Sequence, residues 1–177
     1  MVILSSVFNL NKVKINLLLS ILFLLPLLQS CDPADNEYKK GLKADKPEQK
    51  ILHFTKAIEQ KPKLLMAYFH RGNVYAFKGD FEKAVADYTK SLDIKDRFTA
   101  ARFNRARSYQ EMKKTDLAII DYKKVVEYDP ESPFPHLFLG YIFTKRNAKK
   151  TACHHFNQAC ALENNEGCSQ KESLQCD

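Results

Sequence analysis

The sequence predicts an all-α fold, a solenoid of about four helix-turn-helix repeats followed by a C-terminal capping helix. Three observations lead to this prediction. When the 177-residue sequence is aligned with a copy of itself shifted by 34 residues, Tyr75 aligns with Tyr109 and Tyr88 aligns with Tyr122. Glycine (5) and proline (7) are sparse, and 45% of the residues are hydrophobic. A repeat this short cannot bury its apolar face alone, so neighbouring repeats must stack.

The first thirty residues differ from the rest, because they contain no Asp or Glu. Lys12 and Lys14 precede an apolar run over residues 15–28. A basic start followed by such a run is typical of a secretory signal peptide. The run is also short for a membrane span, which needs roughly 20 apolar residues. Residues 1–30 are therefore predicted to be a signal peptide that is removed.

The apolar run ends in Leu28-Gln29-Ser30-Cys31. This segment resembles the lipobox of bacterial lipoproteins. The resemblance implies cleavage after Ser30 and lipidation of Cys31, and two or three acyl chains give stable membrane attachment. The expected location is the bacterial cell envelope, facing the periplasm or the exterior. Asp32, directly after the lipidated cysteine, resembles a signal for retention in the inner membrane and weakly favours that membrane. The alternative is an ordinary signal peptide or a retained anchor helix, with Cys31 incidental.

The fixed offset pairs residues of the same kind along the chain. Besides the tyrosines, it brings Ala84 onto Ala118 and Asp87 onto Asp121. Small and aromatic residues in this pattern resemble the tetratricopeptide repeat family, a right-handed α-solenoid with a repeat of about 34 residues. The family's helix pairs approach at small residues, and aromatics fill the space around them. The predicted divisions are an atypical first repeat at 31–63, repeats at 64–97, 98–131 and 132–165, and a disulfide-stapled cap at 166–177.

Two arginines stand where many such repeats carry leucine. Arg71 and Arg105 lie on the first helices of their repeats, and Asp87 and Asp121 lie on the facing second helices. We expect each arginine to pair with an aspartate of its own or the adjoining repeat. The alternative is that both arginines reach water independently.

Four cysteines follow Cys31, and all of them lie close to the C-terminus. The segment from Cys160 to Cys168 resembles the cysteine-rich, Sel-like cousins of tetratricopeptide repeats, which implies a disulfide between these two residues. Cys153 precedes this pair and Cys176 follows it at nearly equal distances along the chain. If an antiparallel helix follows, these outer cysteines meet about two turns down the hairpin, which predicts a second bridge.

The sequence contains no nucleophile motif, phosphate loop or carboxylate pair, so an enzyme is not expected. No cofactor is expected either. A metal site built from Cys153, His154 and His155 competes with the bridges, but adjacent residues of a helix point about 100° apart. The formal charge of +7 is spread along the chain and interleaved with acids, so neither nucleic acid nor a small-molecule substrate is an expected partner.

The family resemblance places a binding groove on the first helix of each repeat. The groove suits an extended peptide or an amphipathic helix of an unidentified protein. The expected function is a membrane-tethered scaffold for protein–protein interaction. The alternative is a structural or assembly lipoprotein packed permanently in an envelope complex, which a tightly self-filled concave face would favour. The candidate groove residues are Phe69, Asn73, Phe77, Phe103, Asn104, Arg107, Gln110, Leu137, Tyr141 and Lys145.

Overall fold

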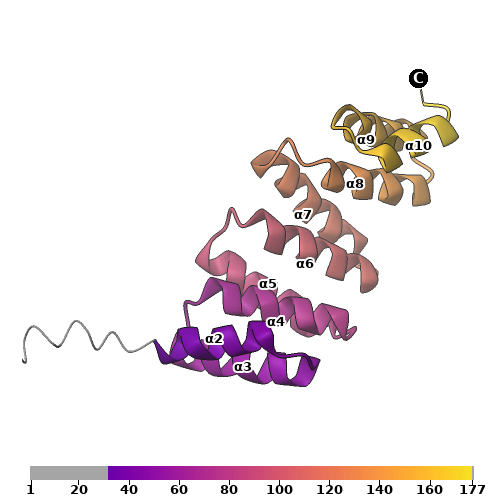
Figure 1. Ribbon diagram of the computed structural model, residues 1–177. Helices are drawn as coiled ribbons and strands as arrows, with labels where there is room; N and C mark the ends of the chain where they lie inside the picture. Colours follow the sequence, from indigo (N-terminus) through magenta and orange to yellow (C-terminus); the bar gives the residue numbers. More distant parts are fainter. Residues whose placement is uncertain (1–31, 177) are drawn as a thin grey trace, which may run out of the picture.

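The computed structural model describes residues 32–176, and the signal segment and Cys31 lie outside this part of the chain. The described residues form helices without strands (Figure 1). Among them, no helix is long and apolar enough to cross a membrane. The helices are α2 (Pro33–Lys43), α3 (Pro47–Gln60), α4 (Leu65–Phe77), α5 (Phe81–Ile94), α6 (Thr99–Glu111), α7 (Thr115–Tyr128), α8 (Pro133–Lys145), α9 (Lys149–Ala161) and α10 (Asn165–Ser173).

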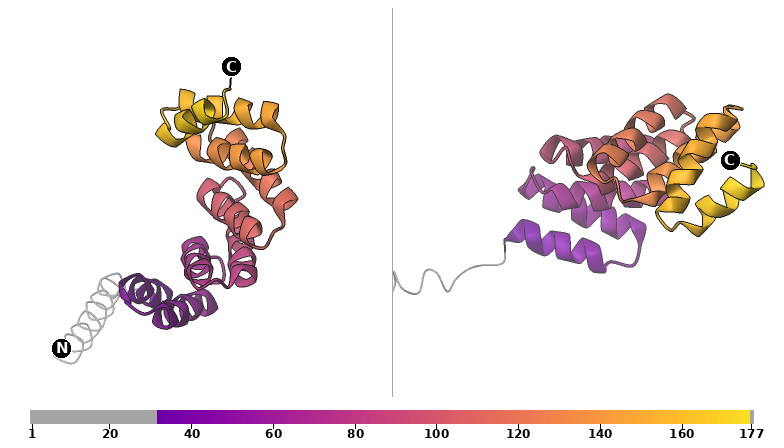
Figure 2. Two further views of the ribbon diagram at one scale, coloured as in Figure 1. Left: turned by 90° about the vertical axis from the view of Figure 1, so that its right-hand side faces the viewer. Right: turned by 90° about the horizontal axis from the view of Figure 1, so that it is seen from above.

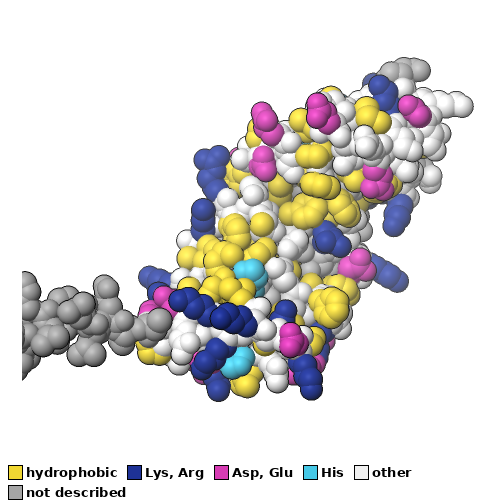
Figure 3. Space-filling view, viewed as in Figure 1, with side chains coloured by type: hydrophobic (Ala, Val, Ile, Leu, Met, Phe, Trp, Pro, Cys, Tyr) yellow, Lys and Arg dark blue, Asp and Glu magenta, His cyan; other side chains and the backbone are white. Residues whose placement is uncertain are grey.

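Consecutive helices pair into hairpins, and the hairpins stack in chain order. The pairs are α2–α3, α4–α5, α6–α7 and α8–α9, with α10 packed on α9 at the end. The stack curves in the left view of Figure 2, so one of its sides is concave. That side faces the viewer in Figures 1 and 3. The structure is therefore an all-α solenoid, as the sequence predicts.

The turns inside the hairpins repeat the sequence period in backbone geometry. Gly79, Lys113 and Asn147 occupy the same place in three successive hairpins, and all three have positive φ, at 81°, 58° and 56°. After each of them an amide reaches back across the turn, as in the Asp80 N–H that donates to the Tyr75 carbonyl at 2.9 Å. This closing bond satisfies carbonyls that the end of a helix would leave unpaired.

Close helix approach at small residues explains the pairing within a hairpin. A Cβ built on Gly140 would lie 2.5 Å from Cε1 of Phe156, and one on Gly72 would lie 2.9 Å from Cε1 of Tyr88. The rings of Phe156 and Tyr88 are fully buried against these glycines. The small and aromatic positions of the repeat therefore interlock across each hairpin.

The first repeat keeps this contact but shifts it. Gly41 lies against Phe54, and these two are closer along the chain than Gly72 and Tyr88 are. The connection from α2 to α3 has the same length as that from α4 to α5, so α2 itself ends about one turn early. This end of α2 leaves part of α4 uncovered.

The predicted Arg–Asp pairs are present, and each spans three helices. Arg71 donates from Nε and Nη2 to the two carboxylate oxygens of Asp87, both at 2.8 Å, and from Nη1 to Thr55 of α3 at 2.8 Å. The equivalent clamp one repeat later joins Arg105 to Asp121 and to a threonine of the preceding helix. Each clamp therefore fixes a hairpin and ties it to the repeat before.

Both predicted disulfides are also present, as Cys153–Cys176 and Cys160–Cys168. They attach α10 and the segment after its end to α9. Of the α10 residues, only Gly167 is buried, against Ala159. Since α10 contributes little apolar surface, the covalent bridges carry much of its attachment.

Candidate functional site

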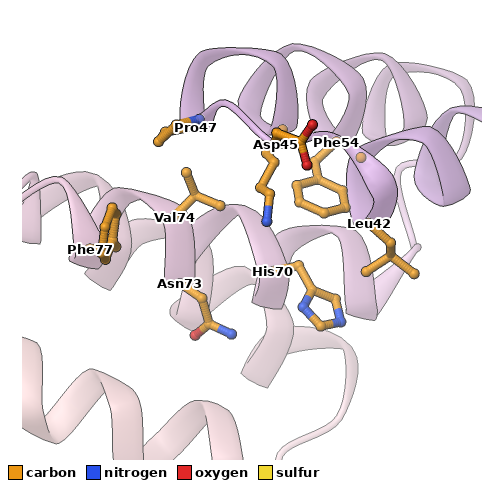
Figure 4. A pocket seen from close by; sticks show the side chains of 10 residues that line it. Leu42, Asp45, Pro47, Phe54, His70, Asn73, Val74 and Phe77 are labelled. Carbon is orange, nitrogen blue, oxygen red and sulfur yellow. The ribbon is translucent and has the colours of Figure 1, made fainter.

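Four hollows follow the first helices of the hairpins along the concave side. The α2–α4 hollow, shown in Figure 4, has a volume of about 360 Å³ and is lined by Gly41, Leu42, Asp45, Pro47, Lys50, Phe54, His70, Asn73, Val74 and Phe77. The α4–α6 hollow, of about 450 Å³, is lined by Asn73, Ala76, Phe77, Phe81, Tyr88, Asn104, Arg107, Ser108 and Glu111.

The other two hollows continue the series. The α6–α8 hollow, of about 450 Å³, is lined by Arg107, Gln110, Glu111, Thr115, Phe138, Ile142, Lys145 and Arg146. The α7–α8 hollow, of about 250 Å³, is lined by Thr99, Ala100, Phe103, Asn104, Val125, Asp129, Ser132 and Phe134. Neighbouring hollows share wall residues, so together they form one groove across the stack.

Asparagines form the middle of this groove. The Tyr88 hydroxyl donates to Asn73 Oδ1 at 2.8 Å, and Asn104 Nδ2 donates to the same oxygen at 2.9 Å. Among residues 32–176, no group accepts from Asn73 Nδ2 or donates to Asn104 Oδ1. Asn73 therefore keeps a donor and Asn104 an acceptor for an outside partner, and these are the two kinds of group that pair with a peptide backbone.

Phe77 is the most exposed large hydrophobic residue of the described chain, with 83% of its surface accessible. It is the last residue of α4 and lines both the α2–α4 and the α4–α6 hollow. Leu42, at 46% accessible, lines the α2–α4 hollow as well. Figure 3 shows further hydrophobic side chains on this side of the molecule, in patches along the stack. Exposed apolar groups beside a hollow are common at protein-binding sites.

Burial shifts the pKa of two groups in the groove wall. Burial, with a smaller contribution from Lys50, lowers the pKa of His70, so this imidazole is neutral at pH 7. Burial also raises the pKa of the Tyr88 hydroxyl, which therefore keeps its proton for Asn73. The His70 ring and the Tyr88 hydroxyl beside Asn73 are thus uncharged and available for hydrogen bonding, while the charged Arg107 and Glu111 line the same hollow as Asn73 and Asn104.

Most of the predicted groove residues do line the hollows. The α2–α4 and α4–α6 hollows include Asn73 and Phe77, and the α7–α8 hollow includes Phe103. Arg107, Gln110 and Lys145 line the α6–α8 hollow, and Asn104 is shared by the α4–α6 and α7–α8 hollows. The full set that lines a hollow is Asn73, Phe77, Phe103, Asn104, Arg107, Gln110 and Lys145.

The prediction for Leu137 is wrong. This residue is 4% exposed and belongs to a core cluster with Phe156, against which Leu174 packs from the end of α10. The capping helix takes the place of a further repeat, so a position that would face a groove faces the core instead. Tyr141 packs edge-on against Phe156, and its hydroxyl donates to Glu166. Phe69 packs in the core cluster of Tyr88, edge-on against Phe98.

The sequence pattern did not indicate several residues that line the groove. The α2–α4 hollow adds Leu42, Lys50, His70 and Val74. A fixed repeat length could not find Leu42 and Lys50, because α2 ends one turn early and the first repeat loses the register of the later ones. His70 and Val74 of α4 line the hollow together with these first-repeat residues. Pro47, which begins α3, is the sequence feature that could have indicated the early end of α2.

Two histidines meet at the other end of the chain, away from the groove. His136 Nδ1 and His155 Nδ1 are 3.1 Å apart, and the His155 ring stacks on Phe143. Burial first, then His136, His154 and Lys123, lower the pKa of His155 to about 4. Within residues 32–176 no group of three or more His, Cys, Asp or Glu residues could hold a metal ion. The Cys153 thiol is consumed by its disulfide.

Comparisons with known proteins agree with this geometry. Residues 66–98 and 99–132 each match the tetratricopeptide repeat family. The crystal structure of MamA has a TM-score of 0.72 with this chain at 16% identity, covering 77% of this chain and 82% of that one. The structure of MamA 41-end from Desulfovibrio magneticus RS-1 has a TM-score of 0.70 at 20% identity, with 75% and 77% covered. No curated protein matches the sequence.

At these identities the solved structures show the fold alone. The family matches add the class, since residues 66–132 are tetratricopeptide repeats. Such repeats form scaffolds for protein–protein interaction. Residues 66–132 therefore form two tetratricopeptide repeats, and α2–α3 and α8–α10 extend the same solenoid at the two ends.

Proposed function

We propose that this protein is a non-catalytic scaffold of the bacterial envelope that holds a protein partner, as an extended peptide or an amphipathic helix, in the groove on its concave side. The observation that carries the proposal is the open series of hollows with Asn73 and Asn104 at its middle. A face that served only for permanent packing within the chain would be filled by its own side chains. Here Phe77 remains 83% exposed at the groove wall.

The tether is a separate part of the proposal. Cys31, the residue whose lipidation the lipobox resemblance implies, lies outside the described residues. The next residue, Asp32, accepts a hydrogen bond from the Ala34 amide at 3.0 Å and caps α2. If Cys31 carries acyl chains, the first hairpin therefore begins almost at the lipid, and the array stands directly at the membrane surface without a linker.

The tether has a direct test. Cells are grown with an alkyne-bearing fatty acid, and the wild-type chain is compared with Cys31→Ser. We expect label and a processed mass only in the wild type. Equal labelling of both chains, or an unprocessed chain without label, would contradict the anchor.

The groove has its own test, which does not depend on the tether. The protein and its variants are used to capture partners from detergent-solubilised membranes. Phe77→Ala and Asn104→Ala should lose the bound protein, and Ile120→Ala should keep it, because Ile120 is 58% exposed on α7 and lines no hollow. Far-UV circular dichroism of each variant checks that the fold persists. Unchanged capture by both groove variants would refute the groove assignment.

The second candidate, a structural lipoprotein packed permanently in an envelope complex, has less support from the structure. It predicts capture that survives both groove variants and is lost on a change to the outer face, such as Ile120→Arg. The same experiment therefore separates the two candidates.

A further inference from the structure

The two ends of the groove differ in chemistry. The α2–α4 end presents the apolar side chains of Leu42, Val74 and Phe77, and its only two full charges in the described lining, on Asp45 and Lys50, are of opposite sign. The α6–α8 end presents three cations, Arg107, Lys145 and Arg146. An occupant that crosses the whole groove therefore meets an apolar surface first and a positive one later.

Two of the cations have no carboxylate partner. Within residues 32–176, neither Arg107 nor Lys145 forms an ion pair, and the Arg107 guanidinium lies 5.9 Å over the ring of Phe138. The third cation, Arg146, is paired with Asp116 at 2.7 Å. The three other arginines on the first helices, Arg71, Arg102 and Arg105, behave differently, since each is paired with an aspartate.

One carboxylate stands in the same hollow. Glu111 lies one turn after Arg107 and lines the α4–α6 and α6–α8 hollows, but it is not within ion-pair distance of any cation there. The lining of the α6–α8 hollow thus carries three positive side chains and one negative side chain, and Asp116 offsets one of the three, Arg146, so that one positive charge remains in excess. Its field attracts an anionic group, and Glu111 weakens that attraction.

From this arrangement we propose that the partner segment is an acidic peptide that binds in one direction along the groove, with a bulky apolar residue beside Phe77 and two carboxylates, the first at Arg107 and the second at Lys145. The proposal rests on the groove function proposed above and names the chemistry of its occupant. The amides of Asn73 and Asn104 line the same α4–α6 hollow as Phe77 and Arg107 and can bond the peptide backbone.

The spacing of the anchors follows from the helices. The hydrogen bond from Asn104 to Asn73 joins α6 to α4, and helices in contact lie about 8–10 Å apart. An extended peptide advances about 3.3 Å per residue, so one helix step corresponds to about three residues. The side chain beside Phe77 and the carboxylate at Arg107 should therefore be about three residues apart, and a second carboxylate at Lys145 should follow about three residues later.

The test uses a library of heptapeptides that are acetylated at the N-terminus and amidated at the C-terminus, so that no terminal carboxylate contributes. The full protein in detergent selects peptides at low salt. We expect a selected pool with an apolar residue followed by Asp or Glu three and six positions later. The dissociation constant of the best peptide should rise with added salt, as exposed ion pairs require.

Variants that remove a positive or a negative charge from the groove should change the affinity in opposite directions. Arg107→Gln and Lys145→Gln should each weaken the selected peptide about two- to fivefold, the range expected of exposed ion pairs. Glu111→Gln should strengthen it by a similar factor, and Lys56→Gln, on the exposed face of α3, should leave it unchanged. Unchanged affinity in both cation variants, or weaker binding in Glu111→Gln, would overturn the proposal.

The outcomes also separate this proposal from the one on which it rests. A selected pool without acidic residues, whose binding is still lost on Phe77→Ala, would overturn the acidic partner and leave the groove function in place. A pool in which no peptide responds to Phe77→Ala would overturn both.

Discussion

The clamp of Arg71, Asp87 and Thr55 links three helices of two repeats, so its removal is a sharp test of how the stack is held together. In Arg71→Leu the carboxylate of Asp87 loses its bidentate partner while the residue stays 5% exposed. Breaking a buried ion pair from one side costs about 3–5 kcal/mol, because a buried charge is left without compensation. The Arg71 side chain keeps 16% exposure, which places the expected loss at the lower end of that range, about 3 kcal/mol.

The unpaired negative charge of Asp87, more than the lost packing of the Arg71 side chain, should account for this loss of stability. The double variant Arg71→Leu/Asp87→Ala removes both charges, and we expect it to be more stable than Arg71→Leu alone. The matched control is Arg97→Leu, since this arginine lies 4.9 Å over the Tyr128 ring and is exposed. Its loss should cost no more than about 1 kcal/mol.

Urea unfolding followed by far-UV circular dichroism and tyrosine fluorescence gives these free energies, and agreement of the two probes shows whether the array unfolds as one unit. Two results would contradict the stabilising role of the Arg71–Asp87 ion pair. One is an Arg71→Leu variant as stable as the Arg97→Leu control. The other is a double variant whose loss equals the sum of the two single losses.

Three further perturbations have definite expected outcomes. Gly140→Ala places a Cβ 2.5 Å from the Phe156 ring and should cost about 1–3 kcal/mol in urea unfolding; an unchanged midpoint would show that the hairpin can open freely. Replacing Cys153 and Cys176 together by Ser removes a bridge across a sequence separation of 23 and should cost roughly 3 kcal/mol, with faster amide exchange in α10 first; uniform exchange along the chain would contradict a local staple. Since the pKa of His155 is lowered from 6.5 to about 4, its neutral form stabilises the fold above pH 6.5, and that stability falls as the pH drops from 6.5 toward 4. His155→Gln should flatten this dependence, which for a partly exposed ring is on the order of 1–2 kcal/mol, and an identical pH profile in the variant would show that other groups cause it.

Much of the fold follows from local sequence features that repeat. The equal spacing of Tyr75 and Tyr109, and of Tyr88 and Tyr122, fixes the register of the central repeats, and the glycines and alanines beside the aromatics fix how each hairpin closes. The Arg–Asp pairs could be predicted because their charges are too costly to bury apart. Both disulfides were predictable from the C-terminal cysteines, one through a family resemblance and the other through the geometry of a helical hairpin.

The ends of the array were harder to predict, because the periodic pattern stops there. The early end of α2 changes the register of the first repeat, and with it the hollow lined by Leu42 and His70. At the other end, α10 converts the position of Leu137 from groove to core. Arg102 was missed as well: it is 7% exposed and reaches both Asp96 and Asp121, and its buried Nε is without a hydrogen-bond partner within the described chain.

The charge pattern of the groove was visible only in three dimensions. In the sequence, Arg107 and Lys145 are two of 28 basic residues spread along the chain. The structure places both on one hollow, and within the described residues neither has a carboxylate partner. Their positions in the sequence could not distinguish these unpaired residues from the paired Arg71 and Arg105, since all four lie on the first helices of their repeats.

The central claim is that the concave groove holds a protein partner, and site-specific photocrosslinking in the native membrane tests it most directly. A benzophenone amino acid is placed at Phe77 in one chain and at Ile120 in another, and both are irradiated in cells. A partner in the groove should give a discrete adduct from position 77 that is competed by the selected acidic peptide, and none from position 120. An adduct from position 120 with none from position 77 would contradict it.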